Sequence, residues 1–462
     1  MRTNPWWQGG SAAISPIQRF RPRPYLAVLY PLVAQLSVRR AVVLLGPRRV
    51  GKTYLIFHLV ERLIHNGVDP RRIGYLDVEH PILQYQPLAA LVEALDNGVP
   101  SSPEQPRFVF LDEIQYLRDW ERHLKPIVDE RPDLRILVSG SAAAALKRSS
   151  QESGAGRFTD FLLPPLTFPE YLHLSERDQL LTVSANEYDV PDYAQLNQAF
   201  VNYLNYGGYP EVALSEEVRA DPQRFIKSDI VDKVLLRDLP ILYGISDVQE
   251  LNALFTMLAY NTAQVISPSE LSQKSNVAKP TLLKYIEYLE AAFLIHRLQR
   301  IDQSGRRFKR QHQFKAYLTN PTMRAALFGE ITSSHDSFGA MVETGLLAQL
   351  FHADREIRYA AWSGGEVDLV HLHRNLQPQS ALEVKWSNQP IRDARLTRNL
   401  VKFCRSTGIS SAICTTMDQW GQRQQDGVLI RLIPAAIMCY HLGAITLDSA
   451  GIPVVAEAKR SE

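Results

Sequence analysis

Cysteine is scarce in this 462-residue sequence, which contains only Cys404, Cys414 and Cys439, all far from a Cys-x-x-Cys spacing. This scarcity excludes a disulfide scaffold and a cysteine-type zinc site, and it fits the reducing cytoplasm, where we expect the protein. Long hydrophobic runs are also missing. No stretch approaches the roughly 18 apolar residues of a membrane span, and the N-terminus lacks the apolar core of a signal peptide. We therefore expect a soluble protein with no membrane partner.

An excess of one charge is absent as well. The sequence has 51 Lys and Arg residues against 49 Asp and Glu residues, a formal charge of +2. A chain that is basic throughout is therefore excluded, and any contact with nucleic acid requires a local patch. Hydrophobic residues make up 45% and charged residues 22%, which is typical of globular proteins. At roughly 150 residues per domain, the length predicts about three domains.

Short apolar runs alternate with helical patterns in the first third of the chain, which predicts a parallel α/β sheet. The pattern then favours helices only, from about residue 168 to 298, and strands return after residue 315. The predicted strands are 41–45, 73–78, 108–111, 136–138, 316–318, 367–370, 381–384 and 411–414, and the predicted helices include 26–36, 54–66, 87–95, 193–204 and 248–260.

The first predicted strand leads into a segment that matches G-x-x-x-x-G-K-[ST] at every fixed position, before a predicted helix. Glycines allow a tight turn whose N–H groups, with the helix N-terminus, surround phosphates. We predict that Lys52 reaches the β- and γ-phosphates and that Thr53 places its hydroxyl on Mg²⁺. The predicted nucleotide-binding residues are Gly46, Pro47, Arg48, Arg49, Val50, Gly51, Lys52 and Thr53.

A second acidic element follows the predicted strand 108–111. We predict that Asp112 holds Mg²⁺ and that Glu113 polarises the attacking water. The next strand ends in Ser-Gly-Ser, and we choose Ser139 over Ser141 as the side chain that senses the γ-phosphate. Arg157 offers a cation for transition-state charge, acting in cis or from a neighbouring subunit.

These motifs resemble the AAA-type P-loop ATPases of bacteria and archaea. The Pro-Leu-Thr-Phe-Pro-Glu-Tyr-Leu run at 165–172 is also similar to that family. The Asp-Glu-Ile-Gln run at 112–115 and the Tyr-Gly-Gly-Tyr-Pro run at 206–210 narrow the resemblance, which covers residues 36 to 442. The family implies an additional-strand core, ATP rather than GTP, a winged-helix segment and a C-terminal domain; such cores often work as rings or dimers. The expected parts are an N-terminal lead (1–35), an ATPase core (36–180), a helical and winged-helix region (181–314), a nuclease-like domain (315–445) and a tail (446–462).

The middle region contains a predicted helix-turn-helix. A capping box at 267–270 opens one helix, and a second helix runs from Lys279 to Glu290 with Lys279, Thr281 and Lys284 facing outward. The segment 297–315 carries seven basic residues against one acid, a charge of +6, and we predict a hairpin with its tip at Ser304 and Gly305. Such a cationic hairpin is suited to the phosphate backbone of DNA, although a winged helix used only for packing remains the alternative.

The C-terminal part resembles the PD-(D/E)xK nucleases. The resemblance rests on Glu343 in a predicted helix, 338–351, Asp368 in one strand, and Glu383 and Lys385 on one face of the next strand. It implies that Asp368 and Glu383 hold Mg²⁺ near a scissile phosphate and that Lys385 orients or activates water. The proline that often precedes the aspartate is absent here.

Two functions follow from these observations. The first is an ATPase whose nucleotide cycle is coupled to DNA binding, with DNA cleavage by the C-terminal domain. The second is a regulatory switch in signalling or transcription that cuts nothing and whose nuclease-like domain binds a partner. A small-molecule kinase is less favoured, because Glu113 after Asp112 favours water as the nucleophile.

Overall fold

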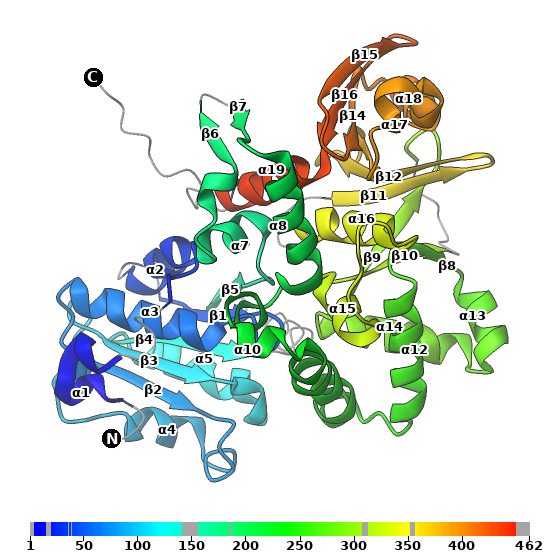
Figure 1. Cartoon of the computed structure of the whole chain (residues 1–462). Coiled ribbons are helices and arrows are strands. Elements are labelled where there is room, and N and C mark those ends of the chain that lie inside the picture. The colour runs from blue at the N-terminus through cyan, green and yellow to red at the C-terminus, as the bar shows by residue number, and fades with distance from the viewer. Residues whose placement is uncertain are drawn as a thin grey trace. The chain divides into compact units, whose positions relative to one another are not determined.

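A computed structural model of the chain describes residues 4–14, 20–35, 37, 39–140, 156–184, 187–306, 313–351 and 356–449. Its contacts divide the chain into two compact units (Figure 1). Unit 1 comprises the described residues up to 165, with 291–293. Unit 2 comprises the described residues of 166–290 and 294–449. Among the described helices, none combines the length and the apolar character that crossing a membrane requires.

Unit 1 is a three-layer α/β structure built on a five-stranded parallel sheet in the order β2-β3-β4-β1-β5. Strand β4 lies between β1, which leads into the phosphate loop, and β3, which ends at Asp112. This is the additional-strand order that the family resemblance implied. Burial of β1, β3 and β4 along their whole length explains their continuous apolar runs. Helices α2 and α3 cover one face and α4 and α5 the other (Figure 1).

The N-terminal lead is part of unit 1, because it packs along the edge strand β2. The Asn4 amide pairs with the backbone N–H and C=O of Tyr75, at 2.7 and 3.0 Å. The indoles of Trp6 and Trp7 both donate to the carbonyl oxygen of Ile73, at 2.8 and 2.7 Å. These contacts satisfy backbone groups that an edge strand would otherwise expose.

The elements of unit 1 include every strand and helix predicted there, to within a few residues, and also helices at 6–9 and 120–130 and a strand at 158–162 that were not predicted. They are α1 (Trp6–Gly9), η1 (Gly10–Ile14), α2 (Leu26–Ala34), β1 (Ala41–Leu45), α3 (Lys52–His65), η2 (Pro70–Arg72), β2 (Ile73–Asp77), α4 (Leu88–Ala94), β3 (Arg107–Asp112), η3 (Ile114–Tyr116), α5 (Trp120–Glu130), β4 (Leu134–Gly140) and β5 (Phe158–Leu162).

Unit 2 begins with a mainly helical region, but the prediction of helices only was wrong, because this region also contains short strands. They form the β6–β7 hairpin and the strands β8 and β9. The elements are α7 (Phe168–Leu174), η4 (Asp178–Leu180), β6 (Thr182–Ser184), β7 (Glu187–Asp189), α8 (Tyr193–Tyr206), α9 (Pro210–Leu214), α10 (Glu216–Arg219), the π-helices η5 (Gln223–Asp232) and η6 (Val234–Asp238), α11 (Leu239–Tyr243), α12 (Val248–Tyr260), β8 (Gln264–Ile266), α13 (Pro268–Ser275), α14 (Lys279–Ala291) and β9 (Ile295–Ile301).

A nine-stranded sheet in the order β15-β16-β14-β13-β12-β11-β9-β10-β8 joins this region to the C-terminal part. Strand β10 pairs with both β8 and β9, and β9 pairs in parallel with β11. The remaining elements are β10 (Phe314–Leu318), α15 (Thr322–Phe328), α16 (Phe338–Ala348), β11 (Glu356–Trp362), β12 (Gly365–Leu372), β13 (Pro378–Glu383), α17 (Gln389–Arg392), η7 (Ala394–Thr397), α18 (Arg398–Thr407), β14 (Ser411–Thr416), β15 (Gly421–Gln425), β16 (Val428–Pro434) and α19 (Ala435–Ser449).

The units differ from the boundaries expected from the sequence. The expected boundary at 314/315 falls inside β10, which pairs with β9 in the same sheet. The expected boundary at 180/181 falls within unit 2, whose core packs α7 and α8 against α16 and α19. The expected tail begins inside α19, and its residues 450–462 lie outside the described residues.

The Tyr-Gly-Gly-Tyr-Pro run lies where α8 ends and α9 begins, and close packing explains its second glycine. A Cβ at Gly208 would lie 2.0 Å from the Asn320 side chain. The Gly208 N–H donates to the Thr322 hydroxyl at 2.9 Å, and its carbonyl oxygen accepts from the N–H of Leu166 at 2.9 Å. This run therefore ties three segments of unit 2 together.

Candidate functional site

The phosphate loop connects the C-terminal end of β1 to α3, which begins at Lys52. Gly46 has no room for a side chain, because a Cβ there would lie 2.2 Å from the carbonyl oxygen of Leu163. Gly51 has a φ of 92°, a left-handed conformation that glycine adopts without strain. The loop thus delivers the N-terminal N–H groups of α3, which have no intrahelical partners and favour bound phosphate.

The Lys52 ammonium lies over its own loop. It is 5% exposed and donates to the carbonyl oxygens of Gly46 and Pro47 at 3.1 and 2.9 Å. The other predicted loop residues have structural contacts. The Arg48 guanidinium lies 3.7 Å from the Glu79 carboxylate, Arg49 has a left-handed φ of 64°, and the buried Val50 accepts a hydrogen bond from Arg23 at 2.9 Å.

Asp112 connects the loop to the end of β3. Its Oδ2 accepts hydrogen bonds from the Thr53 hydroxyl at 2.6 Å and from the Tyr75 hydroxyl at 3.0 Å, and its Oδ1 accepts one from the Ser139 hydroxyl. Burial raises the pKa of this carboxyl, and the charge of Glu113 raises it further. Hydroxyl and carboxylate oxygens at this spacing fit Mg²⁺, which prefers oxygen ligands.

Glu113 lies beside this group, in a left-handed conformation with a φ of 56°. Such a conformation in a non-glycine residue stores strain, and functional sites are where it is usually found. The Glu113 N–H donates to the Ser139 hydroxyl oxygen at 3.4 Å, and its carboxylate accepts from the Gln115 amide. Ser139 therefore contacts both members of the acidic pair, while Ser141 lies outside the described residues.

Tyr75 and Gln115 are two members of this group to which the sequence analysis gave no role. Gln115 belongs to the Asp-Glu-Ile-Gln run that narrowed the family resemblance, so its presence was a usable signal. Tyr75 gave none, because it comes from the neighbouring strand β2, and only the pairing of β2 with β3 brings it to Asp112.

Arg157 lies away from the other predicted residues of unit 1. Its carbonyl oxygen accepts from the N–H of Ala41 at 2.9 Å, which places it at the start of β1, the end opposite the phosphate loop. Its guanidinium pairs with Asp129 on α5 at 2.8 Å, and both side chains are more than a third exposed. Within one copy of the chain, Arg157 is therefore not directed at the phosphate loop.

The structure brings together the residues of the C-terminal motif. Glu343 comes from α16, Asp368 from β12 and Glu383 from β13, and the last two are each 9% exposed. The N–H of Val384 holds Asp368 Oδ2 at 2.8 Å, and the Tyr317 hydroxyl donates to Glu343 Oε1 at 2.5 Å. Burial raises the pKa values of Glu343 and Glu383, and the charge of Asp368 raises both further.

Lys315, which the sequence analysis counted only as part of a basic segment, occupies the centre of these carboxylates. Its Nζ lies 3.0 Å from Glu343 Oε1, 3.4 Å from Asp368 Oδ1 and 2.5 Å from Glu366 Oε1, and its side chain is 4% exposed. Burial lowers the pKa of Lys315, but Glu343, Asp368 and Glu366 more than compensate, so the pKa is raised overall.

Lys385 and Glu383 form the outer part of the cluster. The Lys385 ammonium donates to Glu383 Oε1 at 2.7 Å, while Glu383 Oε2 is buried and has no hydrogen-bond partner within the described part of the chain. Among the residues that the structure describes, no three His, Cys, Asp or Glu side chains are arranged to hold a metal ion. The predicted residues therefore converge, but as they stand they do not fit Mg²⁺.

The basic segment 297–315 differs from the expected cationic hairpin. Arg297 pairs with Glu290 at 2.5 Å, Arg300 donates to the carbonyl oxygen of Ala361 at 2.9 Å, and Lys315 lies in the carboxylate cluster. Arg306 is exposed beside the turn at 302–305, and residues 307–312 lie outside the described residues. The charge of +6 thus overstates what this segment offers a ligand, because three of its cations are engaged within unit 2.

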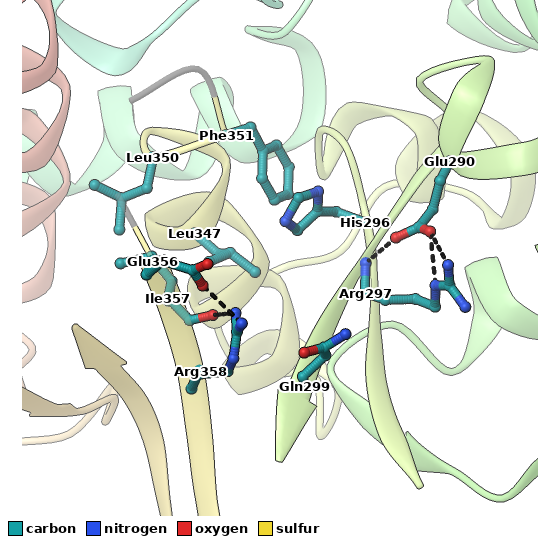
Figure 2. Close-up of a pocket in the computed structure, with 10 residues that line it drawn as sticks. All are labelled: Glu290, His296, Arg297, Gln299, Leu347, Leu350, Phe351, Glu356, Ile357 and Arg358. Atoms are coloured by element: carbon teal, nitrogen blue, oxygen red, sulfur yellow. Dashed lines mark hydrogen bonds and ion pairs between the residues drawn. The ribbon is translucent and has the colours of Figure 1, made fainter. Parts of the chain in front are cut away.

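A pocket of about 350 Å³ adjoins the segment (Figure 2). Figure 2 shows Arg297 turned toward Glu290 on one side and Arg358 toward Glu356 on the other, the latter pair 2.6 Å apart. The His296 ring lies 4.3 Å from the Phe351 ring. Burial lowers the pKa of His296 to about 4, and the charges of Arg297 and Arg358 add to the effect.

Two family models match parts of the chain. Residues 38–172 match a model described as an AAA domain, and residues 197–334 match a domain of unknown function (DUF8612). With the phosphate loop and the five-stranded parallel sheet, the first match establishes an AAA-type P-loop ATPase domain in this part of the chain. The second match runs from α8 past α15 and so crosses the expected boundary at 314/315. Neither description names a nuclease.

Three relatives are similar over a little more than half of the chain. A Haemophilus influenzae protein is 26% identical over 62% of this chain and 68% of its own length. Two Methanocaldococcus jannaschii proteins, MJ1544 and MJ1637, are 24% and 23% identical. The chain spans 55% and 60% of the lengths of these two archaeal proteins. All three are described as uncharacterized proteins.

Among solved structures, ORC1 from Aeropyrum pernix in complex with DNA is similar with a TM-score of 0.34 and 15% identity, over 66% of this chain and 92% of that one. Cdc6p from Pyrobaculum aerophilum has a TM-score of 0.28 and 13% identity, over 65% of this chain and 91% of that one. Both TM-scores lie below 0.5, so neither likeness carries an argument about this chain.

Proposed function

We propose that this chain binds ATP together with Mg²⁺ at the phosphate loop and hydrolyses it to ADP and phosphate. The observation that carries the proposal is the meeting of Thr53 and Asp112, 2.6 Å apart, beside the Lys52 ammonium. Two separate parts of the sequence, the loop residues Lys52 and Thr53 and the strand-end residue Asp112, thus supply a cation, a hydroxyl and a carboxylate to one place, as phosphoryl transfer requires.

Each residue has a distinct part in this proposal. Lys52 exchanges its contacts with two loop carbonyls for the β- and γ-phosphate oxygens, which are stronger acceptors because they are charged. Thr53 and Asp112 would hold Mg²⁺, which when bound neutralises charge on the phosphate oxygens. Glu113 accepts a proton from, or polarises, the water that attacks the γ-phosphorus, and Ser139 fixes the orientation of the acidic pair.

The test separates nucleotide binding from turnover. ATP binding and phosphate release are measured with Mg²⁺ for the wild type, Lys52→Ala, Glu113→Gln and Arg122→Ala, the last an exposed cation on α5 that serves as control. We expect Lys52→Ala to lose binding, and Glu113→Gln to bind ATP but turn over about 100-fold more slowly or worse. Undiminished turnover in Glu113→Gln would assign the attacking water to another residue.

A role for Arg157 requires a neighbouring copy of the chain. Its place at the start of β1 favours the trans alternative over the cis one, because its own phosphate loop lies at the other end of the same strand. We therefore include a homo-oligomer in the proposal, in which Arg157 exchanges Asp129 for the nucleotide of the adjacent subunit.

DNA binding by unit 2 is the second part of the proposal. The order α12, β8, α13, α14, β9, β10, with β10 paired to both β8 and β9, supports the proposal of a winged helix, which has this succession of elements. In α14, Leu282, Ile286 and Leu289 are buried and Lys284 is exposed; Lys274 is exposed near the end of α13. These two lysines, rather than the hairpin, are the cations that we expect to contact phosphate.

Fluorescence anisotropy with a labelled DNA duplex tests this part at two salt concentrations. We expect the double variant Lys274→Glu, Lys284→Glu to weaken binding and to reduce its salt dependence. Lys227→Glu, which changes an exposed lysine on η5 of the same unit, is the control. Equal loss in the control would mean that net charge alone attracts the DNA.

Between the cutting and non-cutting alternatives, the carboxylate cluster favours the second. A PD-(D/E)xK nuclease needs Mg²⁺ between its acidic residues, and here a lysine ammonium contacts two of the three, Glu343 and Asp368. We therefore propose an ATP-dependent switch in which unit 2 binds DNA or another partner without cutting it.

A further inference from the structure

Lys315 contacts three carboxylates that come from two other elements of unit 2. Its Nζ lies within 3.4 Å of an oxygen of Glu343, Glu366 and Asp368. An ammonium group has three N–H donors, so one acceptor is available for each. The ring of Tyr359 lies 5.7 Å from the same nitrogen and adds a favourable contact with the cation. The ammonium is thus fully coordinated.

The same oxygens are those that would bind a divalent cation. Mg²⁺ lies about 2.1 Å from its oxygen ligands, so a metal ion bound to these carboxylates would lie in contact with the Lys315 ammonium. Two positive charges at contact distance repel strongly in a buried site. Lys315 and a metal ion therefore exclude each other.

The cluster nevertheless retains features of a cation site. Its four carboxyl groups (Glu343, Glu366, Asp368 and Glu383) outnumber its two ammonium groups, Lys315 and Lys385. Glu383 is nine-tenths buried, and its Oε2 has no hydrogen-bond partner among the described residues. A buried carboxylate oxygen without a partner is costly, and a nearby cation would remove that cost.

We infer that Lys315 is a built-in counter-cation that occupies a divalent-metal site in unit 2, so that the lysine and a metal ion compete for Glu343, Glu366 and Asp368. The wild-type cluster then binds divalent metal weakly, and removing the ammonium opens the site. This inference concerns unit 2 alone and does not depend on ATP hydrolysis, although it bears on the non-cutting proposal.

The experiment is a titration of the full-length protein with Mn²⁺, in which free Mn²⁺ is counted by its electron paramagnetic resonance signal. Every protein carries Thr53→Ala and no nucleotide is added, so the phosphate loop contributes no metal site. The variants are Lys315→Ala, Lys315→Gln, and Lys315→Ala combined with Asp368→Asn. Lys385→Ala is the matched control, because it changes the net charge equally without vacating the centre of the cluster.

We expect Lys315→Ala and Lys315→Gln to bind one Mn²⁺ at least about tenfold more tightly than the parent protein. The gain should disappear with Asp368→Asn, and Lys385→Ala should gain less. If Lys315→Ala does not fold without metal, Lys315→Gln, which keeps a polar side chain of similar length, decides the question.

Three results would overturn the inference. The first is equal Mn²⁺ affinity in the parent and both Lys315 variants, which would mean that the lysine excludes nothing. The second is an equal gain in Lys385→Ala, which would reduce the effect to net charge. The third is a gain that survives Asp368→Asn. Each of them leaves the ATPase proposal untouched, because that proposal is tested by phosphate release.

Discussion

Lys52 and Lys315 are both almost fully buried, yet their surroundings differ in kind. Lys52 donates to two neutral carbonyl oxygens within six residues of itself, whereas Lys315 contacts three carboxylates from α16 and β12. A cation held by neutral dipoles gains when charged phosphate replaces them. A cation held by carboxylates already has its counter-charges, and losing them is costly. The first is therefore suited to a ligand, and the second to structure.

The largest expected effect is on ATP turnover, and it tests the comparison between Lys52 and Lys315. Lys52→Ala should reduce ATP turnover by about 1,000-fold or more, because the phosphate charge loses its main cation. Lys315→Ala should keep the turnover of the folded protein close to that of the wild type. Phosphate release at one ATP concentration, chosen to saturate the wild type, measures both. A large loss in Lys315→Ala, with unit 2 folded, would contradict the separation of roles.

The second effect is on stability, where we expect the loss of Lys315 to have the larger effect. Lys315→Ala leaves three carboxylates of unit 2 without their cation and should lower the free energy of unfolding by about 3 kcal/mol. Lys385→Ala, whose side chain is 35% exposed and pairs with Glu383, should cost about 1 kcal/mol. Urea unfolding at neutral pH measures both variants. A larger loss for Lys385→Ala would contradict the central place of Lys315.

The third effect concerns His296, a basic group that burial keeps neutral. Its pKa is about 4 in the folded chain against 6.5 when unfolded, so the unfolded state binds the extra proton between these values. Stability is therefore fully present above pH 6.5 and is lost as the pH falls toward 4. We expect a loss of about 2 kcal/mol, because the unfolded chain takes up a proton that the buried ring of the folded chain does not. His296→Gln should flatten this part of the stability profile in urea unfolding measurements.

The smallest effect concerns an exposed pair. Arg157→Ala breaks the contact with Asp129 at the surface of unit 1 and should change stability by less than about 1 kcal/mol. Its effect on turnover should appear only at protein concentrations at which copies associate. Sedimentation and phosphate release over a range of concentrations measure this, and an equal loss at every dilution would favour a role within one copy.

Much of unit 1 could be predicted from the sequence, because its signals are local. The apolar runs lie in buried parallel strands, and the eight loop residues are consecutive, so their order alone specifies strand, loop and helix. Asp112 and Glu113 follow a strand that the same pattern predicts. Two partners of this acidic pair were missed: Tyr75, which strand pairing supplies, and Gln115, which lies two residues after Glu113.

Unit 2 was less predictable, because its contacts join residues that are distant in the chain. Glu343, Asp368 and Glu383 were found by residue type and spacing, but Lys315 was not. In a flat sheet, three strand spacings would separate β10 from β12 by about 14 Å. The contact between Lys315 and Asp368 therefore depends on the curvature of the sheet and the reach of both side chains.

The sequence by itself determined the phosphate loop, the acidic pair and the strands that end at them. Each is made of consecutive residues with fixed backbone requirements, so the order of the residues is enough to recognise it. Tertiary structure alone decided where the charged side chains lie and which groups they contact. It directed Arg297, Arg300 and Lys315 into unit 2 rather than toward a ligand, and it placed Arg157 at the far end of β1. The physical reason is that a charge interacts over a few ångströms through space, and the number of residues between two charges in the sequence does not give their distance in the folded chain.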